Sequence, residues 1–322
     1  MIRCRICSNG ENNRLYSVRE MMFGLREVFD YMECGRCGCL QICEIPASLQ
    51  SYYGDGYYSF AEPRRGPLKS YLKRERSRFS LSGKGLLGRA LSIVYGDPLA
   101  IRWAKEWRDH AGVGPDCSVL DVGCGRGSYF HDLVDVGFTR LHGIDPFLDA
   151  DVHIAGNVKI LKKDLSDVNE AYDFVVLNHS FEHLPDPRAA LRDISRVLAP
   201  EGFALIRTPV VPSYAWRTYG VDWAQLDAPR HLHLHSRRSI ELLAQESGFA
   251  IAGVVYDSDE FQFWGSEQYR RDIPLVDPRS YAVDRSASLF TKKEILSFRE
   301  RAAELNRGGD GDSAGFYLFK NA

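Results

Sequence analysis

The sequence predicts an α/β protein in which a doubly wound, mostly parallel sheet is preceded by a small cysteine-rich module. Three observations support this fold class. From residue 118 onward, apolar strand-like runs alternate with amphipathic helical segments, which is typical of a parallel sheet covered on both faces. Six of the eight cysteines lie within the first 45 residues. A glycine-rich loop, DVGCGRG, follows the first apolar run.

The cysteine-rich module is predicted to span residues 1–45 and to resemble a zinc ribbon. Two C-x-x-C pairs are separated by 26 residues, and four thiolates in this pattern suit tetrahedral zinc; they are Cys4, Cys7, Cys34 and Cys37. Gly35 inside the second pair allows a tight turn around sulfur. Cys39 or Cys43 could replace one of these ligands. Because so short a segment has little core, bound metal would supply folding free energy.

Residues 46–112 are predicted to form an aromatic and basic helical connector. Its tyrosines, Tyr52, Tyr53, Tyr57 and Tyr58, could pack the module in place or stack against an acceptor. Helix is expected over residues 67–110. Residues 64–89 hold nine Lys or Arg and a single acid, Glu75. This basic stretch is either a solvated helical face or a surface that contacts phosphates or a membrane.

The main domain is predicted over residues 113–322. Strands are expected at 118–123, 140–146, 158–165, 172–178, 202–209, 248–258 and 314–321 because these runs are apolar and rich in Val, Ile, Leu or Phe. Helices are expected at 127–136, 187–200, 236–248 and 291–309, where apolar residues recur at helical spacing. Ser236 is the expected N-cap of the third of these helices.

Composition and charge narrow the class of protein further. The formal charge of −2 gives no overall attraction to nucleic acid or anionic membranes. No apolar run is long enough for a membrane span, and the first residues lack the apolar core of a signal peptide. We therefore expect a cytoplasmic protein whose cysteines bind metal or stay reduced. The sequence does not predict the oligomeric state.

The glycine-rich loop indicates which ligand the sheet binds. Ligands of such sheets bind at the carboxyl ends of the strands, and this loop follows the first strand. The spacing Gly123-x-Gly125-x-Gly127 differs from the G-x-G-x-x-G of dinucleotide sites. Asp121, two residues ahead, would repel a pyrophosphate and attract an ammonium group. A nucleoside that carries an α-amino acid fits better, and S-adenosylmethionine is such a ligand.

Residues 113–256 and the final strand resemble the class I S-adenosylmethionine-dependent methyltransferases, which have a Rossmann-like sheet. VLDVGCGRG resembles their first motif, and GIDP and KKDLSD resemble the segments that follow. The resemblance implies that Asp145 binds the ribose hydroxyls and that Asp164 reads the adenine amino group. The cofactor-binding residues expected from loop and resemblance are Asp121, Gly123, Gly125, Gly127, Asp145, Asp164, Leu165 and Asn178.

The segment after the fourth strand, NHSFEHLPDP, carries candidate catalytic residues. His183 beside a carboxylate could act as a general base near neutral pH. Glu182 and His183 also resemble a Glu-His pair of quinone-biosynthesis O-methyltransferases, which implies a divalent metal, although His179 stands where those enzymes have an acid. A third alternative is that this turn only caps the next helix.

A second candidate segment is WAQLDAPRHLHLHS, residues 223–236. His231, His233 and His235 alternate, so they share one face of an extended segment and could bind metal. The pattern also resembles the substrate loop of related methyltransferases, which implies that Arg230 and His231 touch the acceptor. Plain packing is the third alternative. The candidate catalytic residues are therefore His183, His179 and His231.

Together these features predict a methyltransferase that acts on a small polar metabolite, with O-methylation favoured. The cysteine module followed by YYGDGYY resembles a subset of bacterial methyltransferases, which implies a glycosyl or sugar-nucleotide-type acceptor. One alternative is an RNA methyltransferase targeted by a zinc ribbon. The acidic remainder of the chain, and NHSF where base-flipping enzymes have Asn-Pro-Pro-Tyr, argue against a nucleic-acid partner. The other alternative is a non-catalytic cofactor-binding protein.

Overall fold

The computed structural model describes residues 2–53, 66–286 and 288–321. These residues form two compact units. One comprises Met1–Gly54, His179–Leu191 and Ile206–Phe316, and the other comprises Asp55–Asn178, Arg192–Leu205 and Tyr317–Ala322. The domain limits expected from the sequence stay a prediction. Tyr57, Tyr58 and the first two arginines of the basic stretch lie outside the described residues.

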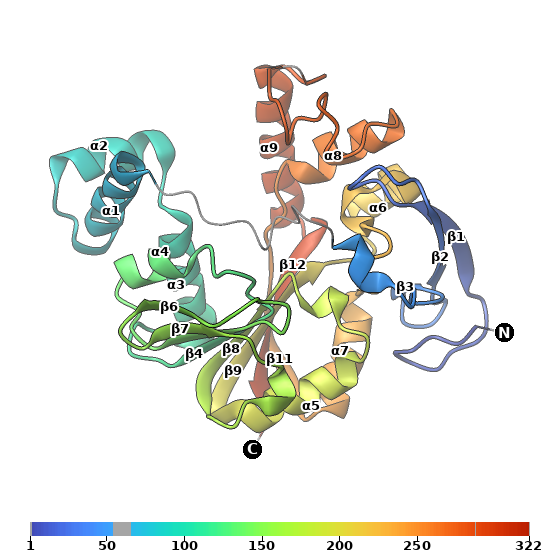
Figure 1. Cartoon of the computed structure of the whole chain (residues 1–322), viewed down its shortest axis with the longest axis horizontal. Coiled ribbons are helices and arrows are strands. Elements are labelled where there is room, and N and C mark those ends of the chain that lie inside the picture. The colour runs from blue at the N-terminus through green and yellow to red at the C-terminus, as the bar shows by residue number, and fades with distance from the viewer. Residues whose placement is uncertain (1, 54–65, 287, 322) are drawn as a thin grey trace. The chain divides into compact units, whose positions relative to one another are not determined.

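The large sheet has eight strands in the order β11-β12-β9-β8-β4-β5-β7-β6 (Figure 1). In chain order they are β4 (Val119–Val122), β5 (Leu141–Ile144), β6 (Val152–Ala155), β7 (Val158–Leu161), β8 (Tyr172–Asn178), β9 (Leu198–Pro209), β11 (Phe249–Tyr256) and β12 (Ser313–Lys320). Strand β4 pairs in parallel with β5 and β8, and β5 pairs in parallel with β7. The predicted mostly parallel α/β fold is therefore confirmed. The sequence did not predict β6, which runs antiparallel to β7.

Helices alternate with these strands along the chain, and five of the seven named next match segments predicted to be helical. The sequence did not predict those at residues 214–219 and 261–270. The seven are α3 (Leu99–Ala111), α4 (Phe130–Asp135), α5 (Pro187–Val197), α6 (Tyr214–Tyr219), α7 (Arg237–Glu246), α8 (Phe261–Arg270) and α9 (Lys292–Arg307). Ser236 caps α7, as expected, and its hydroxyl accepts from the Ser239 backbone N–H. Trp107 of α3 is buried against Phe138 and Phe174, which anchors that helix in its unit. None of the described helices combines the length and the apolar character needed to cross a bilayer.

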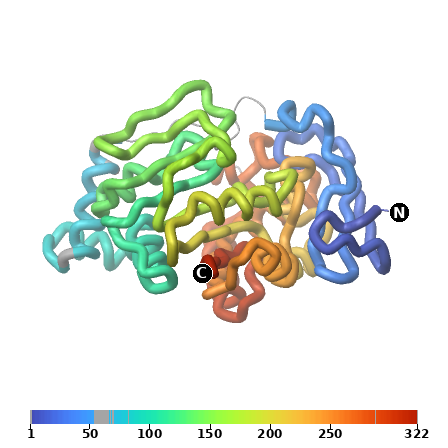
Figure 2. The backbone as a smooth tube through the Cα atoms, turned by 90° about the horizontal axis from the view of Figure 1, so that it is seen from below, coloured from blue at the N-terminus to red at the C-terminus, as the bar shows by residue number. Residues whose placement is uncertain are grey.

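The helix expected over residues 67–110 is broken into three. Before α3 come α1 (Pro67–Ser82) and α2 (Leu86–Tyr95), a helical hairpin that can be followed in Figures 1 and 2. Gly83 ends α1 with φ 68°, a left-handed conformation that favours glycine. Gly88 lets the helices approach closely, because a Cβ there would lie 2.2 Å from the Glu75 carbonyl oxygen.

The N-terminal segment forms a small antiparallel sheet, in the order β1-β2-β3-β10. Its strands are β1 (Arg14–Arg19), β2 (Val28–Glu33), β3 (Leu40–Ile42) and β10 (His233–Leu234). The last of these is remote in sequence and pairs with β3. A buried apolar cluster packs this sheet against α6 and the segment that follows; it includes Tyr31, Trp216, Trp223 and Leu234. The histidine-rich segment is therefore part of the N-terminal sheet.

Short 3₁₀ helices complete the fold. They are η1 (Leu49–Tyr52), η3 (Leu165–Asp167), η4 (Phe181–His183), η5 (Gly220–Asp222) and η6 (Ala224–Leu226). Two of them carry candidate site residues, since Leu165 begins η3 and both Glu182 and His183 lie in η4.

We expect Gly127→Ala to lower the free energy of unfolding by about 2 kcal/mol. Its φ is 62°, and a Cβ would lie 2.4 Å from Ile160 Cδ1. Urea denaturation measures the effect. The matched control is Gly114→Ala, where no heavy atom lies within 4 Å of the Cβ position. A change within about 0.5 kcal/mol is expected for the control. Equal losses in both variants would contradict this account of the loop.

Candidate functional site

The glycine-rich loop after β4 follows a path that side chains would obstruct. Gly123, Gly125 and Gly127 all have positive φ, at 74°, 54° and 62°. The Gly123 N–H donates to the Ile144 carbonyl oxygen at 2.8 Å, which ties the loop to the end of β5. Glycine therefore lets the backbone turn tightly here and approach a ligand without a Cβ in the way.

Asp121 is a buried carboxyl group with an unused acceptor. The residue is 2% exposed, and its Oδ1 has no hydrogen-bond partner among the described residues. The other oxygen accepts from the Tyr129 hydroxyl. Burial, together with the charge of Asp145, raises the pKa of Asp121 to about 7, although the Tyr129 hydrogen bond opposes this. Such a group fits the ammonium end of S-adenosylmethionine, because a cation would compensate the buried charge.

Asp145 follows β5 directly and is held by the same loop. Its carboxylate accepts from the Gly125 N–H at 2.9 Å and from the Phe147 N–H at 3.0 Å. Burial raises the pKa of Asp145, and these two hydrogen bonds act in the opposite direction. Each carboxylate oxygen keeps a second lone pair, so the group can still accept from two ribose hydroxyls. The ribose contact implied by the family resemblance stays a prediction.

The remaining cofactor candidates lie after neighbouring strands. Asp164 follows β7 and accepts from the Ser166 N–H and hydroxyl, both at 3.0 Å, so it caps η3. Leu165 is 8% exposed, and Asn178 is the last residue of β8. Because β4, β5, β7 and β8 form one parallel set, their carboxyl ends face the same edge of the sheet. The roles of these residues stay predictions.

The four predicted zinc ligands converge. The Sγ atoms of Cys4, Cys7, Cys34 and Cys37 all lie within 4.8 Å of one another. Cys4 Sγ is 3.6 Å from Cys37 Sγ, and Cys7 Sγ is 3.5 Å from Cys34 Sγ. Sulfurs bound to one tetrahedral zinc ion at ~2.3 Å would be separated by ~3.8 Å, which is close to these values.

Surrounding N–H groups support the cysteine cluster. Ile6 N donates to Cys4 Sγ at 3.4 Å, Arg36 N donates to Cys34 Sγ at 3.4 Å, and Gln41 Nε2 donates to Cys4 Sγ at 3.1 Å. Donors aimed at sulfur stabilise thiolates and orient them toward a metal. Neither Cys39 nor Cys43 joins the group in the part of the chain that the structure describes. The donor set therefore fits a zinc ion.

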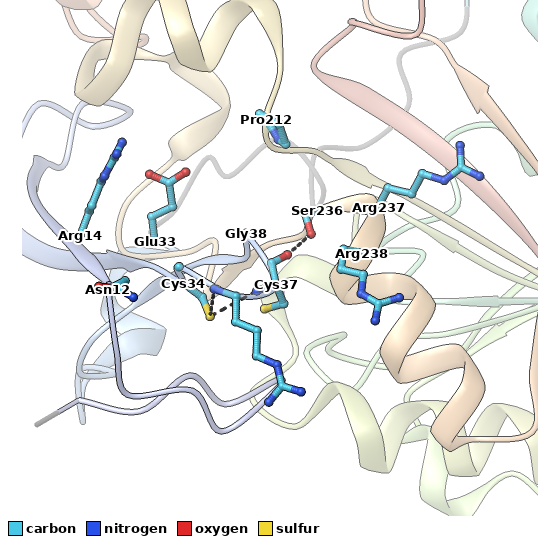
Figure 3. Close-up of a pocket in the computed structure, with 12 residues that line it drawn as sticks. Asn12, Arg14, Glu33, Cys34, Cys37, Gly38, Pro212, Ser236, Arg237 and Arg238 are labelled. Carbon is cyan, nitrogen blue, oxygen red and sulfur yellow. Dashed lines mark hydrogen bonds between the residues drawn. The ribbon is translucent and has the colours of Figure 1, made fainter.

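A pocket of about 630 Å³ opens beside this cluster (Figure 3). Arginines from three elements line it: Arg14 of β1, Arg36 between the cysteines, and Arg237 and Arg238 at the start of α7. The one carboxylate in its lining, Glu33, accepts from the Tyr16 hydroxyl at 2.7 Å. Glu241 lies 3.1 Å from Arg237 and 3.5 Å from Arg238, so four guanidinium groups face two carboxylates. The excess of positive charge makes this surface attractive to anions.

The second cluster of titratable groups surrounds Glu182. This residue is fully buried, and neither of its carboxylate oxygens accepts a hydrogen bond from a described residue. The nearest charged partners are imidazoles, since His179 Nδ1 lies 3.5 Å and His231 Nε2 lies 3.9 Å from Oε1. Burial disfavours the carboxylate, but His179, His231 and His183 outweigh it and lower the pKa of Glu182 to about 2.

His179 is tied to Glu182 by charge and has an unusual backbone conformation. Burial opposes its charged form, but the Glu182 carboxylate outweighs burial and raises the pKa of His179. Its φ of 55° is uncommon for a residue with a side chain, and its N–H donates to the Arg207 carbonyl at 2.8 Å. Strained backbone of this kind is concentrated at functional sites.

His183 presents an unprotonated nitrogen. Its Nδ1 lies 2.9 Å from the Arg230 carbonyl oxygen, and because a carbonyl only accepts, Nδ1 carries the hydrogen. The lone pair is then on Nε2. The Tyr53 hydroxyl also lies 3.0 Å from Nδ1, so one of the predicted tyrosines reaches this cluster. Burial and neighbouring His231 lower the pKa of His183 to about 4, which leaves the ring neutral at pH 7.

His231 has the same tautomer as His183. Its Nδ1 lies 2.7 Å from the Gln225 carbonyl oxygen, so its lone pair is also on Nε2. One donor atom each from Glu182, His183 and His231 lie within 4.8 Å of one another. The cluster is thus rich in acceptors, and it can take a proton or bind a cation.

Arg230 does not have the surface position that a contact with the acceptor would need. Its side chain is fully buried, and it donates to Glu20 at 2.9 Å, Asp227 at 2.6 Å and the Tyr52 carbonyl at 3.0 Å. Its guanidinium therefore fixes the loop, while its carbonyl orients His183. No sequence signal could have revealed Glu20 as the partner, because the two residues are distant in the chain.

The alternating histidines do not form a metal cluster together. His233 and His235 are fully buried, and their rings stack 5.7 Å apart. Of the three, only His231 joins a potential metal-binding group within the described ranges. His233 and His235 do lie on one face, as their alternation predicted, but there they pack in the interior.

Comparison with known proteins gives a match to one family model. A model described as a methyltransferase domain matches residues 67–253. A ubiquinone biosynthesis O-methyltransferase of Xanthomonas oryzae pv. oryzae is 27% identical over 155 residues, which cover 42% of this chain and 61% of that protein. A ubiquinone biosynthesis O-methyltransferase of Pseudomonas fluorescens is 29% identical over 178 residues, which cover 49% of this chain and 74% of that protein. The chain thus spans about three fifths of the length of the Xanthomonas relatives.

Solved structures are also similar to this chain. Geranyl diphosphate C-methyltransferase from Streptomyces coelicolor is 15% identical in sequence, with a TM-score of 0.43. The superposition covers 80% of this chain and 100% of that one.

We expect the purified protein to hold roughly one zinc ion per chain. Cys34→Ser should remove most of it, whereas Cys43→Ser, the matched control, should retain it. Chelation should raise amide exchange in β1–β3 and in residues 231–235 together, because β10 pairs with β3. Metal analysis and hydrogen exchange are the measurements. A zinc-free protein with unchanged exchange in these strands would refute the assignment.

We expect S-adenosylmethionine affinity to rise with pH between 6 and 8. The free protein holds Asp121 with a pKa of about 7, and the ammonium group binds its ionised form. Below that pKa a proton must leave on binding, so affinity should fall by up to about tenfold per pH unit. Calorimetry in buffers of different ionisation enthalpy measures the proton released. Asp121→Asn should bind weakly and release none, and proton uptake by the wild type would contradict this role.

Proposed function

The chain belongs to the methyltransferase-domain family, and from this premise we propose that it is an S-adenosylmethionine-dependent O-methyltransferase of a small polar acceptor. The loop of residues 121–127 would hold the methyl donor, with Asp121 at its amino group and Asp145 at its ribose. His183 would take the proton of the acceptor hydroxyl. Glycosyl or sugar-nucleotide-type compounds are the proposed acceptor class.

The observation that carries the proposal is the neutral His183 with its lone pair on Nε2. Methyl transfer from a sulfonium is an in-line displacement, and the donor is already reactive. The protein must therefore align the acceptor and, for a hydroxyl group, remove its proton. The Arg230 carbonyl keeps the hydrogen on Nδ1, so Nε2 is ready to accept one. The ionised Glu182 nearby would stabilise the imidazolium that forms.

Two further features support an oxygen acceptor that is polar. The relatives reported above are named as O-methyltransferases, although their acceptor is a property of those proteins. The arginine-lined pocket beside the cysteine cluster suits a phosphate-bearing compound, since guanidinium groups bind phosphates through paired hydrogen bonds. A sugar linked to a nucleoside diphosphate carries both a hydroxyl to methylate and such an anionic group.

The same cluster fits a divalent cation as well. The buried Glu182 carboxylate lacks hydrogen-bond donors among the described residues, and carbonyl groups fix the Nδ1 hydrogens of His183 and His231, which is how metal-binding imidazoles are usually oriented. Glu182, His183 and His231 would hold the ion. When bound, it would polarise an acceptor oxygen and favour its deprotonation.

We expect His183→Ala to lower kcat by about 10²–10³-fold while leaving the dissociation constant of S-adenosylmethionine nearly unchanged. Transfer of a labelled methyl group is measured to a panel of nucleoside-diphosphate sugars, catechols and tRNA. The matched control is His153→Ala on β6, an exposed histidine, which should keep wild-type turnover.

Four outcomes decide between the alternatives. Transfer to tRNA alone would overturn the small-molecule acceptor, and wild-type turnover in His183→Ala would remove its role as base. Activity lost on mild chelation and restored by magnesium alone would assign the cluster to a metal. Activity unchanged by chelation would assign it to proton transfer by His183.

A further inference from the structure

The hairpin of α1 and α2 exposes an unusual number of large apolar side chains. Nine of the nineteen exposed large apolar residues in the described chain lie in or beside it; they are Leu68, Tyr71, Leu81, Leu86, Leu87, Ile93, Val94, Tyr95 and Leu99. In α2 the exposed fractions reach 86% for Leu86, 75% for Ile93 and 72% for Val94. Single exposed apolar residues are ordinary, but a contiguous group marks an interaction surface.

Three of these side chains, together with Ala90, share one face of α2. Leu86, Ala90, Ile93 and Val94 recur at helical spacing, so they lie along one side of the helix. The opposite side packs on α1, where a Cβ on Gly88 would lie 2.2 Å from the Glu75 carbonyl oxygen. The apolar face of α2 therefore points away from α1. An amphipathic helix normally buries this face, and here the helix buries its glycine side instead.

Basic residues accompany the apolar face. Arg89 is exposed and lies between Leu86 and Ile93 on the same side of α2, at spacings of three and four residues. Lys84 is exposed in the turn between the helices. Arg74 and Arg78 of α1 are exposed, and each lies 3.6 Å from an acid, Asp135 and Glu75 respectively. Exposed ion pairs of this kind are weak, so these arginines can also contact phosphates.

The positive charge and the exposed apolar side chains of the hairpin together indicate which partner would bind this face. A second copy of the chain would bring two basic hairpins together, and like charges across an interface disfavour association. An anionic lipid surface matches both properties, because apolar side chains enter the headgroup region while Lys and Arg contact lipid phosphates. Residues 64–89 carry nine basic residues and one acid, which gives the segment a strong positive charge.

We propose that the exposed face of α2, with Lys84 and Arg89, docks on the surface of a membrane that contains anionic phospholipid. The hairpin would lie on the headgroups, with Leu86, Ile93 and Val94 inserted among them. This surface belongs to a different part of the chain from the histidine cluster. The proposal therefore stands whether or not the methyl acceptor is the one proposed above.

Vesicle flotation of the full chain tests this. We expect the protein to float with vesicles of phosphatidylglycerol and phosphatidylcholine. With vesicles of phosphatidylcholine alone, the fraction of protein that floats should be roughly tenfold lower. Binding should fall as salt rises, because the Debye length shortens. The double variant Ile93→Ser, Val94→Ser should bind the anionic vesicles roughly tenfold more weakly, or worse. Arg89→Gln should also bind these vesicles more weakly, and its binding should depend less on salt.

The matched control is Leu296→Ser on α9, where the side chain is 55% exposed and distant in sequence from the hairpin. It should float like the wild type, and thermal denaturation should show that all variants stay folded. Equal flotation with both vesicle types, or none with either, would overturn the proposal. Light scattering that finds a dimer dissociated by the double variant, without flotation, would assign the face to a second copy. Binding to tRNA without flotation would assign it to nucleic acid.

Discussion

A carboxylate removed from water must meet a cation, hydrogen-bond donors or a proton, and three buried acids of this chain satisfy that constraint in three ways. Glu20 has a full set of partners, since it pairs with Arg230 and accepts from the Phe23 and Leu25 N–H groups. Asp121 has a raised pKa and one oxygen without a partner among the described residues. Glu182 is surrounded by imidazoles that donate no hydrogen bond to it. The first acid is structural, whereas the other two keep carboxylate oxygens without a hydrogen-bond donor among the described residues.

The N-terminal module and the histidine segment form one structural unit. Strand β10 extends the sheet of the cysteine module, and the Tyr31 hydroxyl donates to the His231 carbonyl at 2.8 Å. The Glu20–Arg230 pair and the Tyr53–His183 contact add to this connection. A buried ion pair is weak evidence of stability, because desolvation offsets much of the attraction. The Glu20–Arg230 pair instead fixes the position of Arg230, whose backbone carbonyl orients the His183 ring. A zinc ion held by the four cysteines would therefore also stabilise the segment that positions His183.

Local chemistry explains why some predictions succeeded. The parallel sheet follows from apolar strands separated by amphipathic helices, and the cysteine cluster follows from two C-x-x-C pairs, because both patterns are short-range. The loop of residues 121–127 is equally local, since its three glycines adopt positive φ, a conformation that glycine takes without steric cost. Residues 67–110 are helical, as predicted, but they form three helices. Gly83, Gly85 and Gly96 interrupt the helical run, and their conformations are left-handed or otherwise unusual for side chains.

The sequence alone determined the fold class, the grouping of the four cysteines and the glycine-rich loop after β4, because in each the decisive residues are neighbours in the chain or repeat with a fixed period. Only the tertiary structure decided that Arg230 is buried against Glu20, that His183 is protonated on Nδ1, and that β10 joins the N-terminal sheet. These contacts join residues far apart in the chain. Their partners are selected by packing and by the compensation of buried charge, and no local pattern encodes either.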